Sequence, residues 1–146
     1  MSRPSGPWVG RPLTTPPDGA EVLRYRAGLA GVRAFTAAWA SRAGLSPHRV
    51  SDLVIAVAEL AANTLAHTSG PGTLMLWATD DEVICQVQDQ GHITDPLAGR
   101  VRPAPDAPGG HRGLWVVRQV CDRVEIRSGQ AGTTVRVYMR RRPGPA

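Results

Sequence analysis

The chain has 146 residues with 17 basic and 12 acidic side chains, a formal net charge of +5 and a hydrophobic fraction of 42%. This length and composition predict one globular domain and exclude a wholly disordered chain. All the basic residues are arginine. P-loop ATPases, Schiff-base enzymes and conventional protein kinases are therefore excluded, because each needs a lysine.

Neither membrane nor secretion signals are evident in the sequence. No apolar run reaches the length of a membrane span, and residues 1–20 contain no secretory signal. The two cysteines, Cys85 and Cys121, are too few for a disulfide framework and are expected to be buried. We expect a cytoplasmic protein.

Hydrophobic periodicity predicts eight elements between a flexible Pro- and Gly-rich segment at 1–20 and a basic tail at 140–146. The expected strands are 22–26, 73–79, 82–88, 123–127 and 133–139, and the expected helices are 29–42, 47–67 and 112–121. Ser46 is the expected N-cap of the second helix. This order predicts an α+β two-layer sandwich with a mixed, mostly antiparallel sheet covered by about three helices.

The helix at 47–67 carries polar residues at every fourth position, namely Glu59, Asn63 and His67, which therefore lie along one side. No cation lies three or four residues from Glu59, so a local ion pair does not explain this carboxylate. One interpretation is a solvated helix edge or an Asn–Glu hydrogen bond. The other is a pocket wall with a general base and a metal or phosphate ligand.

Three further segments combine glycine with polar residues. Asp89 ends a strand and Gly91 follows, which suits an exocyclic amine and a flat ring close to the backbone. The glycine-rich turn at 109–114 opens a helix and contains Arg112, a pattern that suits phosphate. A third segment, at 129–134, precedes the last strand. Each is also compatible with an ordinary turn.

The order of these segments resembles that of the GHKL ATPase superfamily. Glu59 to His67 resembles its N box, Asp89 to Gly91 its first glycine box, Gly110 to Leu114 its second, and Gly132 to Thr134 its third. The resemblance covers roughly residues 21–139. The branch that matches best is the RsbW-like anti-sigma-factor serine/threonine kinases, which implies the Bergerat ATP-binding fold.

For individual residues, the resemblance implies that Glu59 is the catalytic general base and that Asn63 coordinates Mg²⁺. Asp89 reads the adenine amino group, with Gly91 beneath the ring, and residues 92–110 form the ATP lid. The remaining residues implied to bind nucleotide are Gly110, Arg112, Gly113, Leu114, Thr133 and Thr134.

The function implied by the resemblance is transfer of the ATP γ-phosphate to a serine or threonine of an anti-anti-sigma (STAS-type) partner, sequestration of a sigma factor, or both. Relatives often form homodimers, which leaves dimerisation open.

Departures from the family pattern at His111 and at His92-Ile93 leave an alternative, a non-catalytic ATP-binding interaction module with a degenerate lid. A nucleic-acid binder is disfavoured, because the arginines are scattered and the tryptophans Trp39, Trp77 and Trp115 are expected in the core.

Overall fold

The structure is a computed structural model that describes residues 13–26, 28–67, 71–89, 111–129 and 132–141. Its elements are β1 (Glu21–Tyr25), α1 (Ala30–Arg42), α2 (Pro47–His67), β2 (Gly72–Ala78), β3 (Glu82–Asp89), α3 (His111–Val120), β4 (Arg123–Gly129) and β5 (Gly132–Arg140). Every predicted strand and helix is confirmed, with ends that differ by at most two residues. None of the helices in the described chain has the length and apolarity that crossing a bilayer requires.

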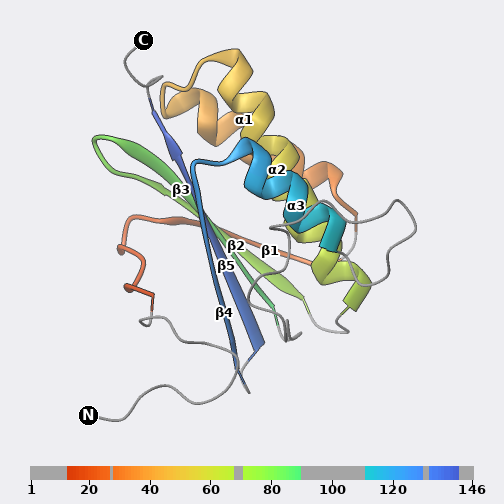
Figure 1. The fold of residues 1–146 in the computed structure, drawn as a ribbon. Coiled ribbons are helices and arrows are strands. Elements are labelled where there is room, and N and C mark those ends of the chain that lie inside the picture. Colours follow the sequence, from red (N-terminus) through yellow and green to blue (C-terminus); the bar gives the residue numbers. More distant parts are fainter. Residues whose placement is uncertain (1–12, 27, 68–70, 90–110, 130–131, 142–146) are drawn as a thin grey trace.

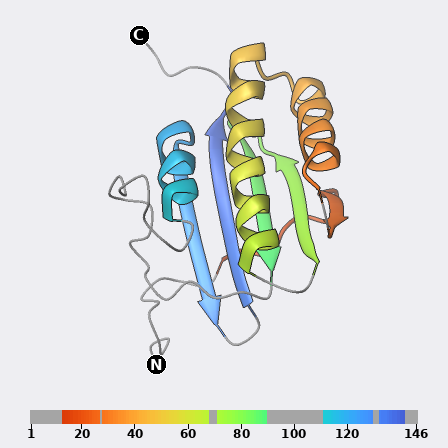
Figure 2. The same cartoon turned by 90° about the vertical axis from the view of Figure 1, so that its right-hand side faces the viewer.

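The strands form one five-stranded sheet in the order β1-β2-β3-β5-β4, covered on one face by the three helices (Figures 1 and 2). The predicted α+β sandwich is confirmed. Its sheet is antiparallel in all four described pairings rather than mixed. Two hairpins, β2–β3 and β4–β5, enforce this pattern, and β5 inserts between β3 and β4 so that it runs against both neighbours.

The main core lies between the sheet and the helices. Val83, Cys85 and Val87 of β3 alternate with residues of the other sheet face and point toward the helices. The helix α2, in the middle of the helical layer, contributes the buried residues Leu53, Ala56, Val57, Leu60 and Ala61. Burial of each large apolar side chain contributes about 1.5–3 kcal/mol. This packing holds α2 against the sheet in one rotation about its axis, and the rotation determines which way the polar side of the helix faces.

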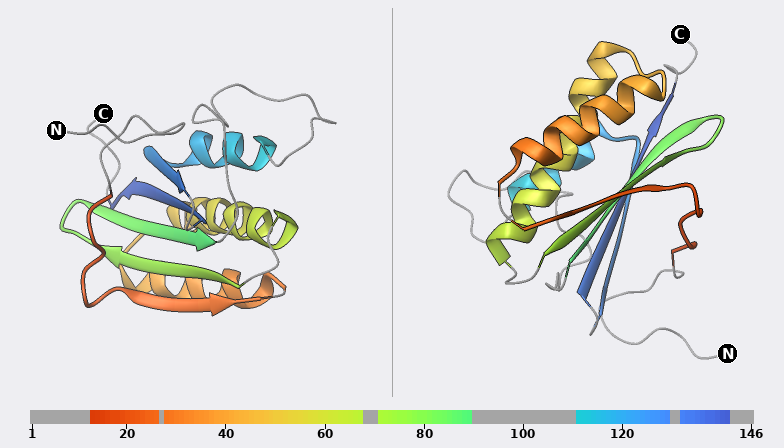
Figure 3. Two further views of the ribbon diagram at one scale, coloured as in Figure 1. Left: turned by 90° about the horizontal axis from the view of Figure 1, so that it is seen from below. Right: turned by 180° about the vertical axis from the view of Figure 1, so that it is seen from behind.

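A second, smaller cluster occupies the open face of the sheet and contains Trp77, Ile84 and Tyr138. Trp39 lies in the main core as predicted, but Trp77 is buried on the opposite face of the sheet. Residues 13–20, which belong to the predicted flexible segment, run along this open face (Figure 3). We call residues 13–20 the N-terminal strap.

Two local features match their sequence signals. The amide of Arg49 donates to Ser46 Oγ at 3.3 Å, which confirms the predicted N-cap of α2. At the start of β2, Gly72 lies beneath the ring of Tyr25, its partner on β1, where a Cβ atom would overlap the ring. Glycine is therefore required for β1 and β2 to pair at this point.

Candidate functional site

The segments singled out in the sequence meet at one end of the sandwich. The end of α2, the end of β3, the start of α3, the end of β4 and the start of β5 all lie there (Figure 2). We call this the site end. The opposite end holds the ends of α1, β2 and β5 (Figure 2). The antiparallel order produces this grouping, because β3 and β4 run toward the site end and β5 begins there.

Glu59 and Asn63 of α2 face Gly113 of α3. A Cβ atom on Gly113 would lie 3.0 Å from Glu59 Oε2, 3.4 Å from Asn63 Nδ2 and 3.5 Å from Asn63 Oδ1. The shortest of these distances is below ordinary van der Waals contact, so glycine allows α3 to approach the polar side of α2. The glutamate and the asparagine are both half-buried. The fold thus brings three predicted site residues together.

Gly113 is the third residue of α3 and belongs to its first turn. Backbone N–H groups of a first turn have no acceptor within their own helix, and the helix dipole is positive there. The first turn of α3 has no acidic residue of its own. Leu114, the next residue, is buried in the core. An anion beside Asn63 would meet these N–H donors.

A second polar group of the site end lies on the sheet. Asp89, the last residue of β3, is opposite Thr133 of β5, and Thr133 is opposite Ser128 of β4. The hydroxyls of Ser128 and Thr133 are 3.0 Å apart, and Thr133 is buried. Thr133 shares the helix-covered face with Val135. Thr134 lies on the open face, because side chains alternate along a strand.

Ser128 is the member of this row that sequence reasoning missed, because Ser128-Gly129 reads as a turn. The available signal was the alternation of Val124, Ile126 and Ser128. It becomes visible once β4 continues to Gly129, two residues beyond the predicted end of that strand.

Comparison with known proteins assigns the chain to a family. The histidine kinase-like ATPase domain family matches residues 25–139. The chain belongs to this family. No curated protein matches the sequence.

A solved structure of the RsbU and RsbW domains of Rv1364c from Mycobacterium tuberculosis is similar to this ATPase domain, with a TM-score of 0.60 and 20% sequence identity. The match covers 84% of this chain and 33% of that one, so the present chain spans about a third of the other's length. At this level of identity the similarity shows a shared fold.

Family membership implies ATP binding, and the residues of the site end fit a nucleotide. Gly113 lets the first turn of α3 lie so close to Glu59 and Asn63 that a Cβ atom there would come within 3.0 Å of Glu59 Oε2. Within the residues that the structure describes, no three His, Cys, Asp or Glu side chains gather as a metal cluster. A cation at Asn63 would therefore need phosphate and water oxygens as further ligands, which is the usual coordination of Mg²⁺ beside nucleotides.

The cysteines of the ATPase domain are free and buried, as predicted. Burial raises the pKa of Cys121 to about 12. Burial, followed by the proximity of Cys121, also raises the pKa of Cys85 well above its ordinary value. Burial thus keeps both thiols neutral at physiological pH, and neither is activated as a nucleophile.

Some predicted features lie outside the described residues. They are Gly91, Gly110, the lid at 92–110 and the outer parts of both tails. Arg112 and His67 belong to α3 and α2, but their side chains also lie outside the described part. The first residue of the predicted basic tail, Arg140, is the last residue of β5.

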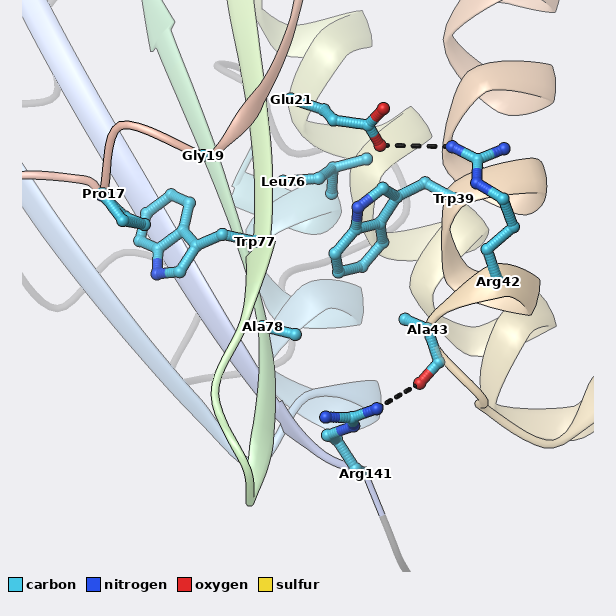
Figure 4. A pocket seen from close by; sticks show the side chains of 10 residues that line it. All are labelled: Pro17, Gly19, Glu21, Trp39, Arg42, Ala43, Leu76, Trp77, Ala78 and Arg141. Atoms are coloured by element: carbon cyan, nitrogen blue, oxygen red, sulfur yellow. Dashed lines mark hydrogen bonds and ion pairs between the residues drawn. The ribbon is translucent and has the colours of Figure 1, made fainter.

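A pocket of about 430 Å³ lies at the opposite end of the ATPase domain (Figure 4). Its charged side chains already have partners within the chain. Arg42 pairs with Glu21 at 3.2 Å, and Arg141 Nη2 donates to the carbonyl of Ala43 at 2.7 Å. The other lining residues are Pro17, Gly19, Trp39, Leu76, Trp77 and Ala78. This pocket is separate from the site end.

Proposed function

We propose that this ATPase domain binds ATP and Mg²⁺ at the site end and transfers the γ-phosphate to a serine or threonine of a partner protein. The convergence of Glu59 and Asn63 on Gly113, in the first turn of α3, carries the proposal. A carboxylate, a carboxamide and a helix N-terminus meet there. Phosphoryl transfer requires these kinds of group: a base, a metal ligand and donors to phosphate oxygens.

The phosphates bind at the first turn of α3. Backbone N–H groups from Gly113 and Leu114 donate to phosphate oxygens, and the helix dipole favours their negative charge. Gly110 belongs to the same binding turn. Arg112 supplies a positive charge in place of the lysine that the chain lacks.

Asn63 would hold Mg²⁺ through its carboxamide oxygen. A neutral ligand is suitable because the triphosphate supplies the negative charge and the metal keeps several waters. When bound, the ion would offset negative charge on the phosphates during transfer. Asn63 follows Glu59 by one helical turn of α2, so the metal ligand and the base lie on the same side of the helix.

Glu59 acts as the general base. The acceptor hydroxyl oxygen bonds to the γ-phosphorus while the bond from phosphorus to the β–γ bridging oxygen breaks, and ADP leaves. The hydroxyl proton passes to the carboxylate of Glu59. With water as the acceptor, the same step is ATP hydrolysis.

The adenine lies toward the polar row at the end of the sheet. Asp89 accepts a hydrogen bond from the exocyclic amine, and Gly91 lies beneath the ring. Thr133 is the threonine that contributes here, since it lies on the helix-covered face beside Ser128. Thr134 is on the other face.

The proposed partner of the transfer is a STAS-type anti-anti-sigma protein, and the domain sequesters a sigma factor as well or instead. The shared fold with the RsbW domain of Rv1364c supports this choice. The protein is then a cytoplasmic regulator of transcription.

Thermal unfolding tests the proposed nucleotide site. Millimolar ATP with Mg²⁺ is expected to raise the Tm of the wild type by several degrees, because a ligand that binds only the folded state stabilises it. Asn63→Ala is expected to lose this shift. Ser51→Ala, an exposed change on the same helix, is the matched control and keeps it.

The outcomes separate the two functions that the sequence leaves open. No shift with the wild type contradicts the nucleotide site. A shift that depends on Asn63, without phosphate transfer to a STAS-domain protein or to water, contradicts the kinase and leaves a non-catalytic ATP-binding interaction module.

A further inference from the structure

The open face of the sheet contains a buried arginine. Arg136 of β5 is 2% exposed. Its Nε and Nη2 atoms donate to Gln86 Oε1 of β3 at 3.0 and 2.7 Å. Its guanidinium also lies 5.0 Å from the centre of the Trp77 ring. The flat cation is thus held between a neutral amide and an indole.

The N-terminal strap completes the shell around Arg136. Nη1 donates to Thr14 Oγ1 at 2.9 Å, and Nη2 donates to the Thr14 carbonyl oxygen at 2.6 Å. Two oxygens on the two terminal nitrogens of a guanidinium are the arrangement that a bidentate carboxylate adopts. Thr14 therefore places two neutral oxygens where the two oxygens of a carboxylate could bind Arg136.

Within the described residues, no ion pair joins Arg136 directly to a carboxylate. Glu125, its partner in the strand register, instead accepts a hydrogen bond from the Tyr138 hydroxyl and lies 3.7 Å from Arg127 Nη2. A buried charge without a counter-ion is unfavourable. A carboxylate in place of Thr14 would supply the missing negative charge.

The surroundings of Arg136 favour an acidic ligand. Alternation along the strands places an excess of arginines on the open face. The arginines are Arg24, Arg123, Arg127, Arg136 and Arg140, against the two glutamates Glu82 and Glu125. Arg123 lies over the Tyr138 ring at 3.8 Å. The face therefore combines excess positive charge with the apolar cluster.

The strap forms few hydrogen bonds to the rest of the described chain. Besides the bonds from Arg136 to Thr14, Ala20 packs against the cluster of Trp77, Ile84 and Tyr138. The one backbone hydrogen bond found for residues 13–20 in the described chain is internal, from Ala20 N–H to the Pro17 carbonyl. Other residues of the strap, such as Thr15 and Asp18, are exposed. A competing segment would therefore have to break few hydrogen bonds of the strap.

We infer that the open sheet face binds an extended acidic segment of a partner protein, whose aspartate or glutamate carboxylate replaces Thr14 on Arg136, and that the strap competes with it. A polypeptide is favoured over a nucleic acid because a polypeptide already fills the site, with a backbone carbonyl on Arg136 and an alanine on the apolar cluster. This inference does not depend on nucleotide binding.

A test in the full chain compares Thr14→Asp with Thr14→Asn. The two side chains have the same shape, and the aspartate adds the negative charge. Thr14→Asp is expected to have a Tm about 3 °C above that of Thr14→Asn, because a charge-assisted pair is stronger than a neutral one. Equal Tm values would overturn the assignment of a carboxylate site.

A second test measures displacement by fluorescence anisotropy. The probes are labelled peptides that copy residues 13–20 with either the Thr14→Asp or the Thr14→Asn change. The wild type is expected to bind the aspartate peptide about tenfold more tightly. Arg136→Gln loses this preference, whereas Arg33→Gln, an exposed change of the same charge on α1 in the helical layer, keeps it.

Equal affinity of the two peptides, or a preference that survives Arg136→Gln, would overturn the inference. Preferential binding of a single-stranded oligonucleotide that Arg136→Gln abolishes would assign the face to nucleic acid and would also overturn it. If Arg136→Gln does not fold, the Tm comparison of the two Thr14 variants decides alone.

Discussion

The two ends of the sandwich use polar side chains differently. At the opposite end, arginines bind acceptors of the chain itself. Arg141 donates to the carbonyls of Thr79 and Ala43 at 2.9 and 2.7 Å. Arg49 donates to Asp122 Oδ2 at 3.1 Å and to the Arg140 carbonyl at 3.0 Å. These bonds connect the helical layer to the end of the sheet.

At the site end, Glu59 and Asn63 instead face a glycine on the neighbouring helix. A larger residue at position 113 would close this approach. Polar side chains at the opposite end stabilise the fold because the chain itself supplies their partners, whereas Glu59 and Asn63 at the site end lie against a glycine and are the groups proposed to act on a nucleotide.

The largest expected effect is that of Glu59→Gln. The amide keeps the shape of the side chain but cannot accept the proton, so the rate of ATP hydrolysis should fall by about 10²–10⁴-fold. The rise in Tm with ATP and Mg²⁺ should remain. Phosphate release measures the rate, and Glu21→Gln at the opposite end is the control. An unchanged rate of ATP hydrolysis would show that Glu59 is not the general base.

Arg49→Met should lower the free energy of unfolding by about 2 kcal/mol, because it removes hydrogen bonds from a charged donor that is largely buried. Urea unfolding measures this loss, and ATP affinity should not change. Arg42→Met is the matched control. It breaks the exposed pair with Glu21 and should cost less than about 1 kcal/mol. Equal losses of unfolding free energy in the two variants would contradict a larger stabilising role for Arg49.

Gly113→Ala should weaken ATP binding about tenfold, because a methyl group 3.0 Å from Glu59 Oε2 displaces the polar pair. Titration calorimetry measures the affinity. Gly31→Ala in α1, where an added Cβ meets nothing within 4 Å, should leave affinity unchanged and stabilise the helix by up to about 1 kcal/mol. Equal affinity of Gly113→Ala and the wild type contradicts the close approach.

Alkaline pH should destabilise the domain through its buried thiols. The pKa values of both thiols are raised in the folded state, that of Cys121 to about 12. Their contribution to stability is therefore complete below the ordinary value of 9.0 and is lost progressively as pH rises above it. At about pH 10 each thiol should cost on the order of 1 kcal/mol. Because the chain has no lysine, few other groups titrate in this range.

Urea unfolding at about pH 8 and pH 10 measures this loss, and Cys121→Ala should reduce it. The Tyr138 pKa is also raised, chiefly by burial, and acts in the same direction. If the wild type and Cys121→Ala lose stability in parallel, the thiol at position 121 is not responsible. Cys121→Ala should not affect ATP binding, because Cys121 follows the last residue of α3, at the far end of the helix from its first turn.

Local signals were sufficient to predict the elements. The spacing of apolar residues indicated α2 from Pro47 to His67, and Ser46 indicated where it begins. The order of strands in the sheet had no local signal. The insertion of β5 between β3 and β4 depends on pairings between distant segments, such as Val87 with Val135. Such pairings are decided by burial of the whole sheet face.

The candidate site was partly accessible to sequence reasoning. Glu59 and Asn63 were recognised from their spacing on one helix, and Asp89 from its place at a strand end. The choice between Thr133 and Thr134 required the strand register, as did the addition of Ser128. Periodicity indicates which residues of one helix or strand share a face. The strand register is needed to know which residues of neighbouring strands lie side by side.

By itself, the sequence determined the eight elements, the class of fold and the polar side of α2, because these depend on contacts over a few residues. The tertiary structure alone decided that Gly113 meets Glu59 and Asn63 and that Thr14 covers Arg136, 122 residues away. Both contacts join elements that pack only when the core forms. The position of one element on another depends on the burial of all of them together.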